Sequence, residues 1–239
     1  MASTPQVELR CDLRVLHRAD GSASIGRLAK KPFSVANSNF KESSVFWAAV
    51  YGPADCPPAK RKIDRAYLQV QLRLSSQNTV SPPSICKFES LLYQACQSAI
   101  LLENHPRAQF MVVIQEIEGC RGGYTVSQAV NTACMALLDA SVPMRGVFCG
   151  VCVGLSQEGD LQVDPDIEFL ENSRAHFEFV FLQYQGSRLE VVASHSAGGP
   201  FDLAAYVSAL GLAKSGAGKI FKFYRESMEK KFASEPPPQ

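Results

Sequence analysis

Residues 117–144 read IEGCRGGYTVSQAVNTACMALLDASVPM, and this stretch decides the fold because a glycine-rich turn leads directly into a strongly patterned helix. Thr125-Val-Ser-Gln128 fits a capping box, in which Thr125 caps the first turn and the Gln128 side chain reaches back to it. Small and apolar residues then form one side of the helix: Val126, Ala129, Val130, Ala133, Cys134 and Leu137. A helix with small, apolar side chains on one side can lie close against a sheet. A helix start after such a turn also attracts anions through free backbone N–H groups and the helix dipole, so it is a candidate phosphate site.

The segments on either side of this helix alternate between strand and helix patterns. Strands are predicted at residues 44–51, 66–74, 110–117, 147–155, 161–164, 175–184 and 189–193. Helices are predicted at residues 84–102 and 202–232, and Gly211, Gly216 and Gly218 weaken the middle of the second. This order of elements predicts one α+β domain.

The composition excludes several classes of protein. With 46% hydrophobic and 20% charged residues, the chain resembles an ordinary globular protein. Its net charge of +1 gives no overall field that would attract nucleic acid or a membrane, so any RNA-binding surface must be a local patch. Neither a membrane-spanning apolar run nor a secretory signal at MASTPQVELR is recognisable, which predicts an intracellular chain.

The eight cysteines are expected to be reduced in such a chain. Cys149-Gly-Val-Cys152 imitates a redox CxxC motif, but it lies inside a predicted strand and not at a helix start, where a helix dipole would lower the thiol pKa. Residues three apart in a strand also point to opposite faces. The sequence therefore favours structural cysteines, and no Cys/His spacing predicts a metal site.

Three runs resemble the ribonuclease PH family: AAVYGP (Ala48–Pro53), NTACMALLDASVPM (Asn131–Met144) and HSAGGPF (His195–Phe201). RADGSAS (Arg18–Ser24), NTACMALLDASVPMRGVFCGV (Asn131–Val151) and FKFYRES (Phe221–Ser227) resemble the branch of that family that forms the core of the RNA exosome. The resemblance implies one ribonuclease PH-like domain, of the ribosomal protein S5 domain 2-like kind, over residues 1–232. Residues 25–41 depart from the family as a longer loop or insertion, and the tail at 233–239 is expected to be disordered.

Active members of this family resemble one another in being phosphorolytic 3′-to-5′ exoribonucleases. Their chemistry needs arginines to hold phosphate beside the anionic RNA backbone. The resemblance places Val126 where the family has its phosphate arginine, and no arginine occurs from Gly122 to Met144. Arg121 has no fixed role in this register, and the position of a second phosphate arginine falls near Cys96 in a segment without arginine.

The chemistry also needs carboxylates for proton transfer or metal binding. The paired aspartates of the family fall on Asn172 and Glu178, and asparagine cannot replace a carboxylate in either role. Glu178 itself is interpreted as a solvated strand carboxylate, on the face opposite Phe177, Phe179 and Phe181. The resemblance and these departures together predict a degenerate site without catalytic residues, metal or cofactor.

The resemblance instead implies a scaffold role in 3′-to-5′ RNA processing, including rRNA maturation and RNA turnover. In the family, similar subunits pair and close into a hexameric ring, which S1/KH-type RNA-binding subunits cap and which feeds RNA to a separate nuclease. The expected partners are therefore other ribonuclease PH-like exosome subunits, S1/KH-type cap subunits and RNA, with no membrane. The expected location is the nucleus and nucleolus, and also the cytoplasm.

Two stretches are candidate RNA contacts. Lys60, Arg61, Lys62 and Arg65 occupy the connection between two strands that faces the channel in relatives, although a solvated turn explains them equally well. The C-terminal run KIFKFYRESMEKKF mixes aromatic and basic residues, but its helical spacing favours packing of the aromatic residues into the core. Two other functions stay open: a homodimeric nuclease acting on RNA or DNA, and a stand-alone RNA-binding domain.

Overall fold

The computed structural model describes residues 7–29, 43–74, 82–118, 125–165, 169–170, 172–184 and 188–234. The strands are β1 (Val7–Leu13), β2 (Gly21–Ala29), β3 (Ser43–Asp55), β4 (Tyr67–Arg73), β5 (Ala108–Glu118), β6 (Gly146–Leu155), β7 (Leu161–Val163), β8 (Ala175–Tyr184) and β9 (Leu189–Gly198). The helices are α1 (Pro82–Ala99), the short 3₁₀ helix η1 (Leu102–Asn104), α2 (Thr125–Asp139) and α4 (Leu203–Ser234). None of the described helices is long and apolar enough to span a membrane.

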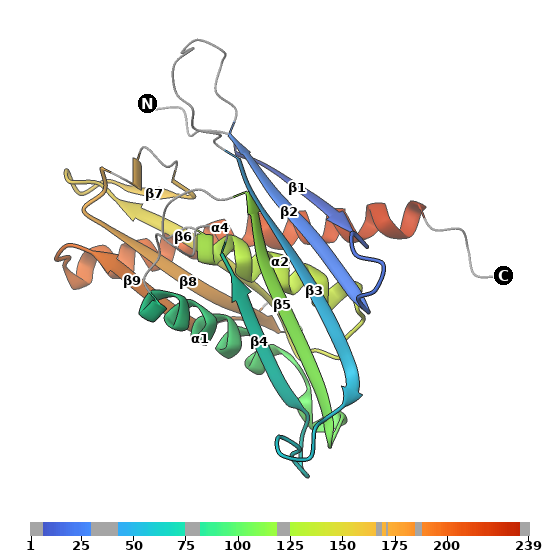
Figure 1. The fold of residues 1–239 in the computed structure, drawn as a ribbon. Helices are drawn as coiled ribbons and strands as arrows, with labels where there is room; N and C mark the ends of the chain where they lie inside the picture. The colour runs from blue at the N-terminus through green and yellow to red at the C-terminus, as the bar shows by residue number, and fades with distance from the viewer. Residues whose placement is uncertain are drawn as a thin grey trace.

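The strands form two sheets. The first has five described strands in the order β1-β2-β3-β5-β4, and the second has four in the order β7-β6-β8-β9. Neighbouring strands are antiparallel except β4 and β5, which are parallel. A parallel pair needs a long crossover, and α1 lies in the connection from β4 to β5. Figure 1 shows the blue-to-green sheet and the yellow-to-orange sheet with α2 between them.

The helices form two layers around the second sheet. Helix α2 contacts β2 and β3 of the first sheet and β6 and β8 of the second, and α1 contacts β4 on one side and β9 on the other. Helix α4 contacts β6 and β8 from the opposite face, where the rings of Phe177 and Phe179 pack against Tyr206. Both faces of the second sheet are therefore covered by helices, which explains why most of β6 and β8 is buried.

Two glycines permit α2 to lie very close to strands of both sheets. A Cβ atom at Gly150 of β6 would lie 2.8 Å from the Ser127 Cα atom, and one at Gly21 of β2 would lie 2.2 Å from the Ala140 nitrogen. Real Cβ atoms do not approach other atoms so closely, so any larger residue at either position would move the helix. The small-residue side predicted for this helix is confirmed, because Ala129, Ala133 and Val130 are fully buried.

The side chain of Asn131 joins α2, β6 and α4. Its Oδ1 accepts hydrogen bonds from the Gly150 N–H (2.7 Å) and from the Tyr224 hydroxyl (2.8 Å), and its Nδ2 donates to the Gly150 carbonyl (3.1 Å). Asn131 thus supplies the backbone of β6 with the donor and acceptor that a neighbouring strand would otherwise provide. Tyr224 is only 3% exposed, so its hydroxyl depends on this bond.

Replacing Tyr224 with phenylalanine is expected to lower the free energy of unfolding by about 1 kcal/mol, the usual net value of one buried hydrogen bond. The ring stays in the core, so the packing is preserved. Urea denaturation followed by far-UV circular dichroism measures the change. Tyr206→Phe is the matched control, because the Tyr206 hydroxyl bonds to Ser194 in an exposed position and its loss should have a smaller effect. Equal effects of the two substitutions would contradict the prediction.

The structure confirms the predicted strands and helices but corrects several details. The Gln128 side chain does not reach back to the helix start: its Nε2 donates to the Ile25 carbonyl (3.0 Å) and the Ser44 carbonyl (2.9 Å), and its Oε1 accepts from the Ser44 hydroxyl. The capping-box prediction was therefore wrong in this half, because β2 and β3 pack against α2 and offer stronger partners.

The predicted loop at 25–41 begins too early, since residues 25–29 continue β2 and pair with β1. Residues 30–41 lie outside the described part of the chain. Helix α4 runs without a break through Gly211, Gly216 and Gly218. Gly216 is favoured by close packing, because a Cβ there would lie 2.9 Å from a Val163 methyl group. Of the predicted tail, Ala233 and Ser234 belong to α4, and residues 235–239 are not described.

Candidate functional site

The first turn of α2 holds Val126, which the resemblance places at the position of the phosphate arginine, and this side chain is fully buried. An apolar side chain without exposed surface cannot bind phosphate, and an arginine in its place would have to bury its charge. The glycine-rich turn before it, including Arg121 and Gly122, lies outside the described residues. Cys96 on α1, near the second arginine position, is also fully buried, and burial raises the pKa of its thiol to about 12.

Glu178 lies in the middle of β8, directly opposite Cys152 of β6 and His195 of β9. Its side chain points to the face that α1 and α2 cover, because Gly150, on the same face of β6, touches Ser127 of α2. The residue is 1% exposed, and neither carboxylate oxygen has a hydrogen-bond partner among the described residues. Burial raises the pKa of Glu178 well above its usual value.

The interpretation of Glu178 as a solvated carboxylate was therefore wrong. The alternation of β8 correctly placed Phe177, Phe179 and Phe181 on one face, where their rings contact one another and α4. The opposite face was expected to meet water. It meets two helices instead, which a strand pattern alone cannot reveal.

Asn172 lies three residues before β8 and is exposed, whereas Glu178 is buried. The two positions at which the family carries paired aspartates thus have different environments as well as different chemistry. An exposed amide and a buried carboxyl with a raised pKa do not form a pair that exchanges protons with a substrate. Within the described ranges, no cluster of three or more His, Cys, Asp or Glu side chains could hold a metal ion.

Two histidines near Glu178 were not predicted as part of this region. His176 is on β8, two residues before Glu178, and His195 is its cross-strand neighbour. Burial lowers the pKa of both imidazoles, with a further contribution from His195 at His176 and from Lys87 at His195. Both rings are therefore neutral at pH 7 and add no positive charge that would attract phosphate.

The CxxC cysteines occupy the buried strand β6, as predicted. Cys149 pairs with Phe181 and Cys152 pairs with Glu178, so the two thiols point to opposite faces of the sheet. Burial raises the pKa of both thiols well above the usual value, and Glu178 adds to this effect at Cys152. Thiols of this kind stay protonated and react slowly.

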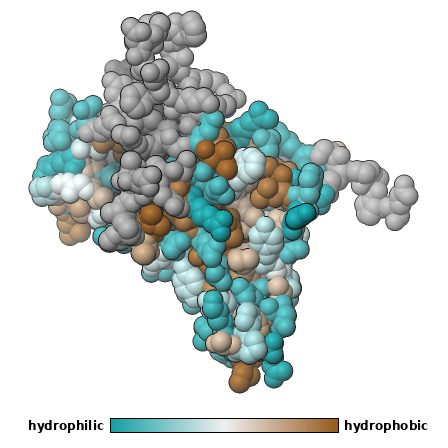
Figure 2. Space-filling view, in the orientation of Figure 1, coloured by the Kyte–Doolittle hydropathy of each residue, from teal (hydrophilic) through white to brown (hydrophobic). Residues whose placement is uncertain are grey.

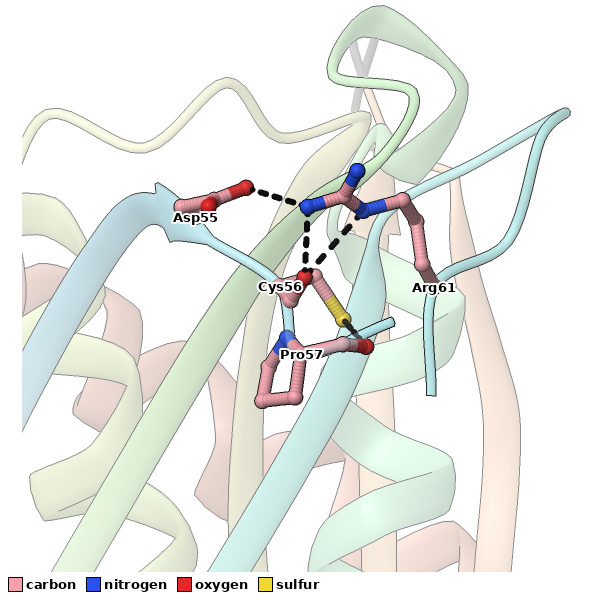
Figure 3. A network of polar contacts seen from close by, with 4 residues as sticks. All are labelled: Asp55, Cys56, Pro57 and Arg61. Carbon is pink, nitrogen blue, oxygen red and sulfur yellow. Dashed lines mark hydrogen bonds and ion pairs between the residues drawn. The ribbon is translucent and has the colours of Figure 1, made fainter. Parts of the chain in front are cut away.

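The basic residues predicted to contact RNA lie in the loop between β3 and β4, and one of them fixes the conformation of that loop. Arg61 donates to the Cys56 carbonyl from Nε (3.1 Å) and from Nη2 (3.0 Å), and its Nη2 also contacts the Asp55 carboxylate (2.8 Å). Figure 3 shows this guanidinium between the side chain of Asp55 and the backbone of Cys56. Arg61 therefore has a structural task within the loop.

The other three basic residues of this loop are exposed. Lys60 lies over the ring of Tyr67, with its Nζ 5.3 Å from the ring centre, and Arg65 contacts the neighbouring Asp64 at 3.1 Å. The Lys62 carbonyl accepts a hydrogen bond from the Arg107 N–H, and Lys62 itself is exposed. The loop forms the lower tip of the molecule in Figure 1.

Comparison with known proteins supports the family resemblance over nearly the whole chain, although no family model matches it. The chain is 27% identical over 226 residues to the Exosome complex component RRP46 homolog of Caenorhabditis elegans, covering 95% of both proteins. It is 28% identical over 250 residues to the Exosome complex component Rrp41 of Pyrobaculum arsenaticum, covering 95% of this chain and 87% of the relative. It is also 28% identical over 188 residues to the Exosome complex exonuclease RRP46 homolog of Arabidopsis thaliana, covering 79% and 70%.

Two solved structures share the fold. The crystal structure of rice (Oryza sativa) Rrp46 matches with a TM-score of 0.78 at 20% identity, over 95% of this chain and 98% of the rice chain. A chain of an archaeal exosome core matches with a TM-score of 0.68 at 15% identity, over 92% and 87%. The protein is therefore a homologue of the exosome components RRP46 and Rrp41, and it has the RNase PH-like α+β fold that its motifs predicted.

Proposed function

We propose that this protein is a core-ring subunit of an RNA exosome and that it contributes to RNA processing without phosphorolytic chemistry of its own. Similarity over 95% of the chain to exosome components supports the ring assignment. The observation that carries the second part is the fully buried Val126 at the phosphate-arginine position. The buried Glu178, whose pKa is raised, supports it further.

The partners in this proposal are other RNase PH-like subunits, which flank the protein in a hexameric ring, together with S1/KH-type cap subunits and RNA. The role is to support 3′-to-5′ processing and degradation, such as rRNA maturation and RNA turnover, in the nucleus and nucleolus and also in the cytoplasm. The exposed Lys60, Lys62 and Arg65 supply positive charge for RNA phosphates where the loop meets the channel, while Arg61 holds the loop in shape.

A phosphorolysis assay tests the catalytic part of the proposal. The purified chain, alone and with its ring partners, is incubated with end-labelled single-stranded RNA and inorganic phosphate, and nucleoside diphosphates are separated by chromatography. We expect no release above background, because a transition state that lacks both phosphate arginines loses several kcal/mol of stabilisation and each ~1.4 kcal/mol is tenfold in rate. A catalytically active member of the ribonuclease PH family serves as the positive control.

Affinity purification from cells tests the ring part independently. Co-purification of RNase PH-like and cap subunits supports ring assembly. A homodimeric nuclease is the second candidate function, because the Arabidopsis thaliana relative is named an exonuclease. Phosphate-dependent release of nucleoside diphosphates would overturn the non-catalytic role. Recovery of the homodimer alone, with hydrolytic cleavage of RNA or DNA that co-elutes with it, would favour the second candidate over the ring.

A further inference from the structure

A groove beside the second half of α4 has no role in the proposed function. Its volume is about 450 Å³, and it lies between α4, the end of α2, and the neighbouring ends of β6 and β8. Half-buried apolar side chains form its floor: Leu138, Val147, Phe221 and Met228. Lys222 and Arg225 form its rim. The groove is therefore an apolar surface edged by positive charge.

The charges on the rim are available to a ligand. The Lys222 side chain is 78% exposed, and its single described ion pair, with Glu226, is 3.8 Å long and exposed. Arg225 is exposed and makes no hydrogen bond or ion pair with any described residue. No carboxylate is among the described residues that line the groove. An anion placed there would meet two cations without competition from an acidic lining.

The aromatic floor is held in a fixed position. The Phe221 ring meets the Tyr224 ring edge to face, with 6.1 Å between their centres. Tyr224 is itself buried and is anchored through its hydroxyl to Asn131 at 2.8 Å. The exposed part of Phe221 therefore forms a rigid platform that loses little conformational freedom when a ligand binds.

We propose that this groove binds single-stranded nucleic acid, with one base on Phe221 and the adjoining phosphates against Lys222 and Arg225. A positively charged groove with an aromatic platform is the arrangement that binds single strands without reading their sequence. The volume lies within the ~300–1,000 Å³ range of small-ligand sites, enough for one nucleotide. The amide of Gln183, at the end of the groove, offers a donor and an acceptor to a base edge.

The groove lies away from the basic β3–β4 loop, and binding of nucleic acid there does not depend on ring assembly. The β3–β4 loop forms the lower tip of the molecule in Figure 1, whereas the red half of α4 lies at the right, away from that tip. An acidic peptide would also be attracted by the rim, but it would not need the flat face of Phe221. The aromatic ring thus distinguishes the two kinds of ligand.

Fluorescence anisotropy with a short fluorescein-labelled oligouridylate tests the proposal over a range of salt concentrations. The background for all variants is Lys60→Gln/Lys62→Gln, so that the β3–β4 loop contributes little. For Lys222→Gln/Arg225→Gln we expect weaker binding and a slope of log affinity against log salt that is smaller by about 1.4, or ~0.7 per lost phosphate contact. Lys214→Gln/Lys230→Gln is the matched control, because both lysines are exposed on α4, outside the groove, and the change in net charge is the same.

Phe221→Leu tests the base platform, because leucine keeps an apolar side chain but removes the aromatic face. We expect it to weaken binding of the oligouridylate roughly five- to tenfold without changing the salt slope. Thermal denaturation of each variant confirms that the fold is preserved. Equal salt slopes for the groove and control pairs would overturn the proposal. Unchanged binding by Phe221→Leu, with polyglutamate displacing the RNA from the groove, would assign the groove to an acidic peptide instead.

Discussion

Replacing Lys231 with methionine is expected to lower the free energy of unfolding by about 3–5 kcal/mol, the usual cost of removing one partner from a buried ion pair. The Lys231 Nζ lies 2.7 Å from Asp139 Oδ1, and the two side chains are only 12% and 2% exposed. The second oxygen of Asp139 accepts a hydrogen bond from the Ser22 N–H at 2.9 Å. One carboxylate therefore joins the end of α4 to the end of α2 and the start of β2.

Without Lys231, the Asp139 charge stays buried and loses its ion pair, while it keeps the hydrogen bond from the Ser22 N–H. Urea denaturation measures the loss, and the melting temperature should fall by roughly 10 °C for a domain of this size. Lys230→Met is the matched control, since Lys230 is exposed on the same turn. The double variant Asp139→Asn/Lys231→Met should be more stable than Lys231→Met alone, because it removes the uncompensated charge. A cost no larger than that of Lys230→Met would show that the pair contributes little.

Replacing Glu178 with methionine is expected to raise the free energy of unfolding at pH 7 by about 1–3 kcal/mol, the cost of a buried polar group without a partner. Glu178 is 1% exposed, and both of its oxygens are unsatisfied among the described residues. Methionine fills a similar volume without a polar group and is flexible enough to fit an irregular site. A buried carboxyl without a hydrogen-bond partner among the described residues thus weakens the fold.

The effect of Glu178→Met should grow with pH. The folded-state pKa of Glu178 lies well above the ordinary 4.5, so the folded protein binds more protons than the unfolded chain between these two values. Stability is therefore lost as pH rises above 4.5 and through the folded-state pKa, by up to ~1.4 kcal/mol per pH unit. Glu178→Met should lack this loss. Urea denaturation at several pH values from about 5 upward measures it.

The histidines beside Glu178 also make the stability of the protein depend on pH, and their effect lies toward acid pH. The pKa values of His176 and His195 are lower in the folded protein than the ordinary 6.5, so both contribute stability that is lost as pH falls through 6.5. This loss should be the same with and without Glu178. Glu158→Met, at an exposed carboxylate, is the control for the substitution itself. A parallel pH dependence of Glu178→Met and the unmodified protein would contradict the assignment.

The local patterns of the sequence determined where the elements lie. Alternation predicted β8 at its observed bounds, and the stripe of small residues correctly indicated a helix that packs tightly against a sheet. These predictions succeeded because strand and helix periodicities are properties of neighbouring residues. The register of the motif likewise predicts Val126 at the position where the family has its phosphate arginine, and this correspondence stays a prediction.

Contacts between residues far apart in the chain could not be predicted from these local patterns. Gln128 fits a capping box by spacing, yet its partners are Ile25 and Ser44, which lie 103 and 84 residues away in the chain. The alternation of β8 suggests that Glu178 faces solvent, yet α1 and α2 cover that face of the sheet and bury it. The groove beside α4 exists because ends of α2, β6 and β8 lie next to that helix. Spacing along the sequence does not predict which of these distant elements come together.

The sequence by itself thus determined the fold class and the order of the strands and α-helices from β3 to α4, because both depend on residue type and spacing. Strands β1 and β2 were not predicted, and the loss of the phosphate arginines stays a prediction. The tertiary structure decided the environments: that Glu178 is buried, that Arg61 holds a loop while Lys60 and Lys62 face solvent, and that Lys222 and Arg225 border a groove. Burial and charge pairing depend on which surfaces meet, and a protein's chemistry follows from them.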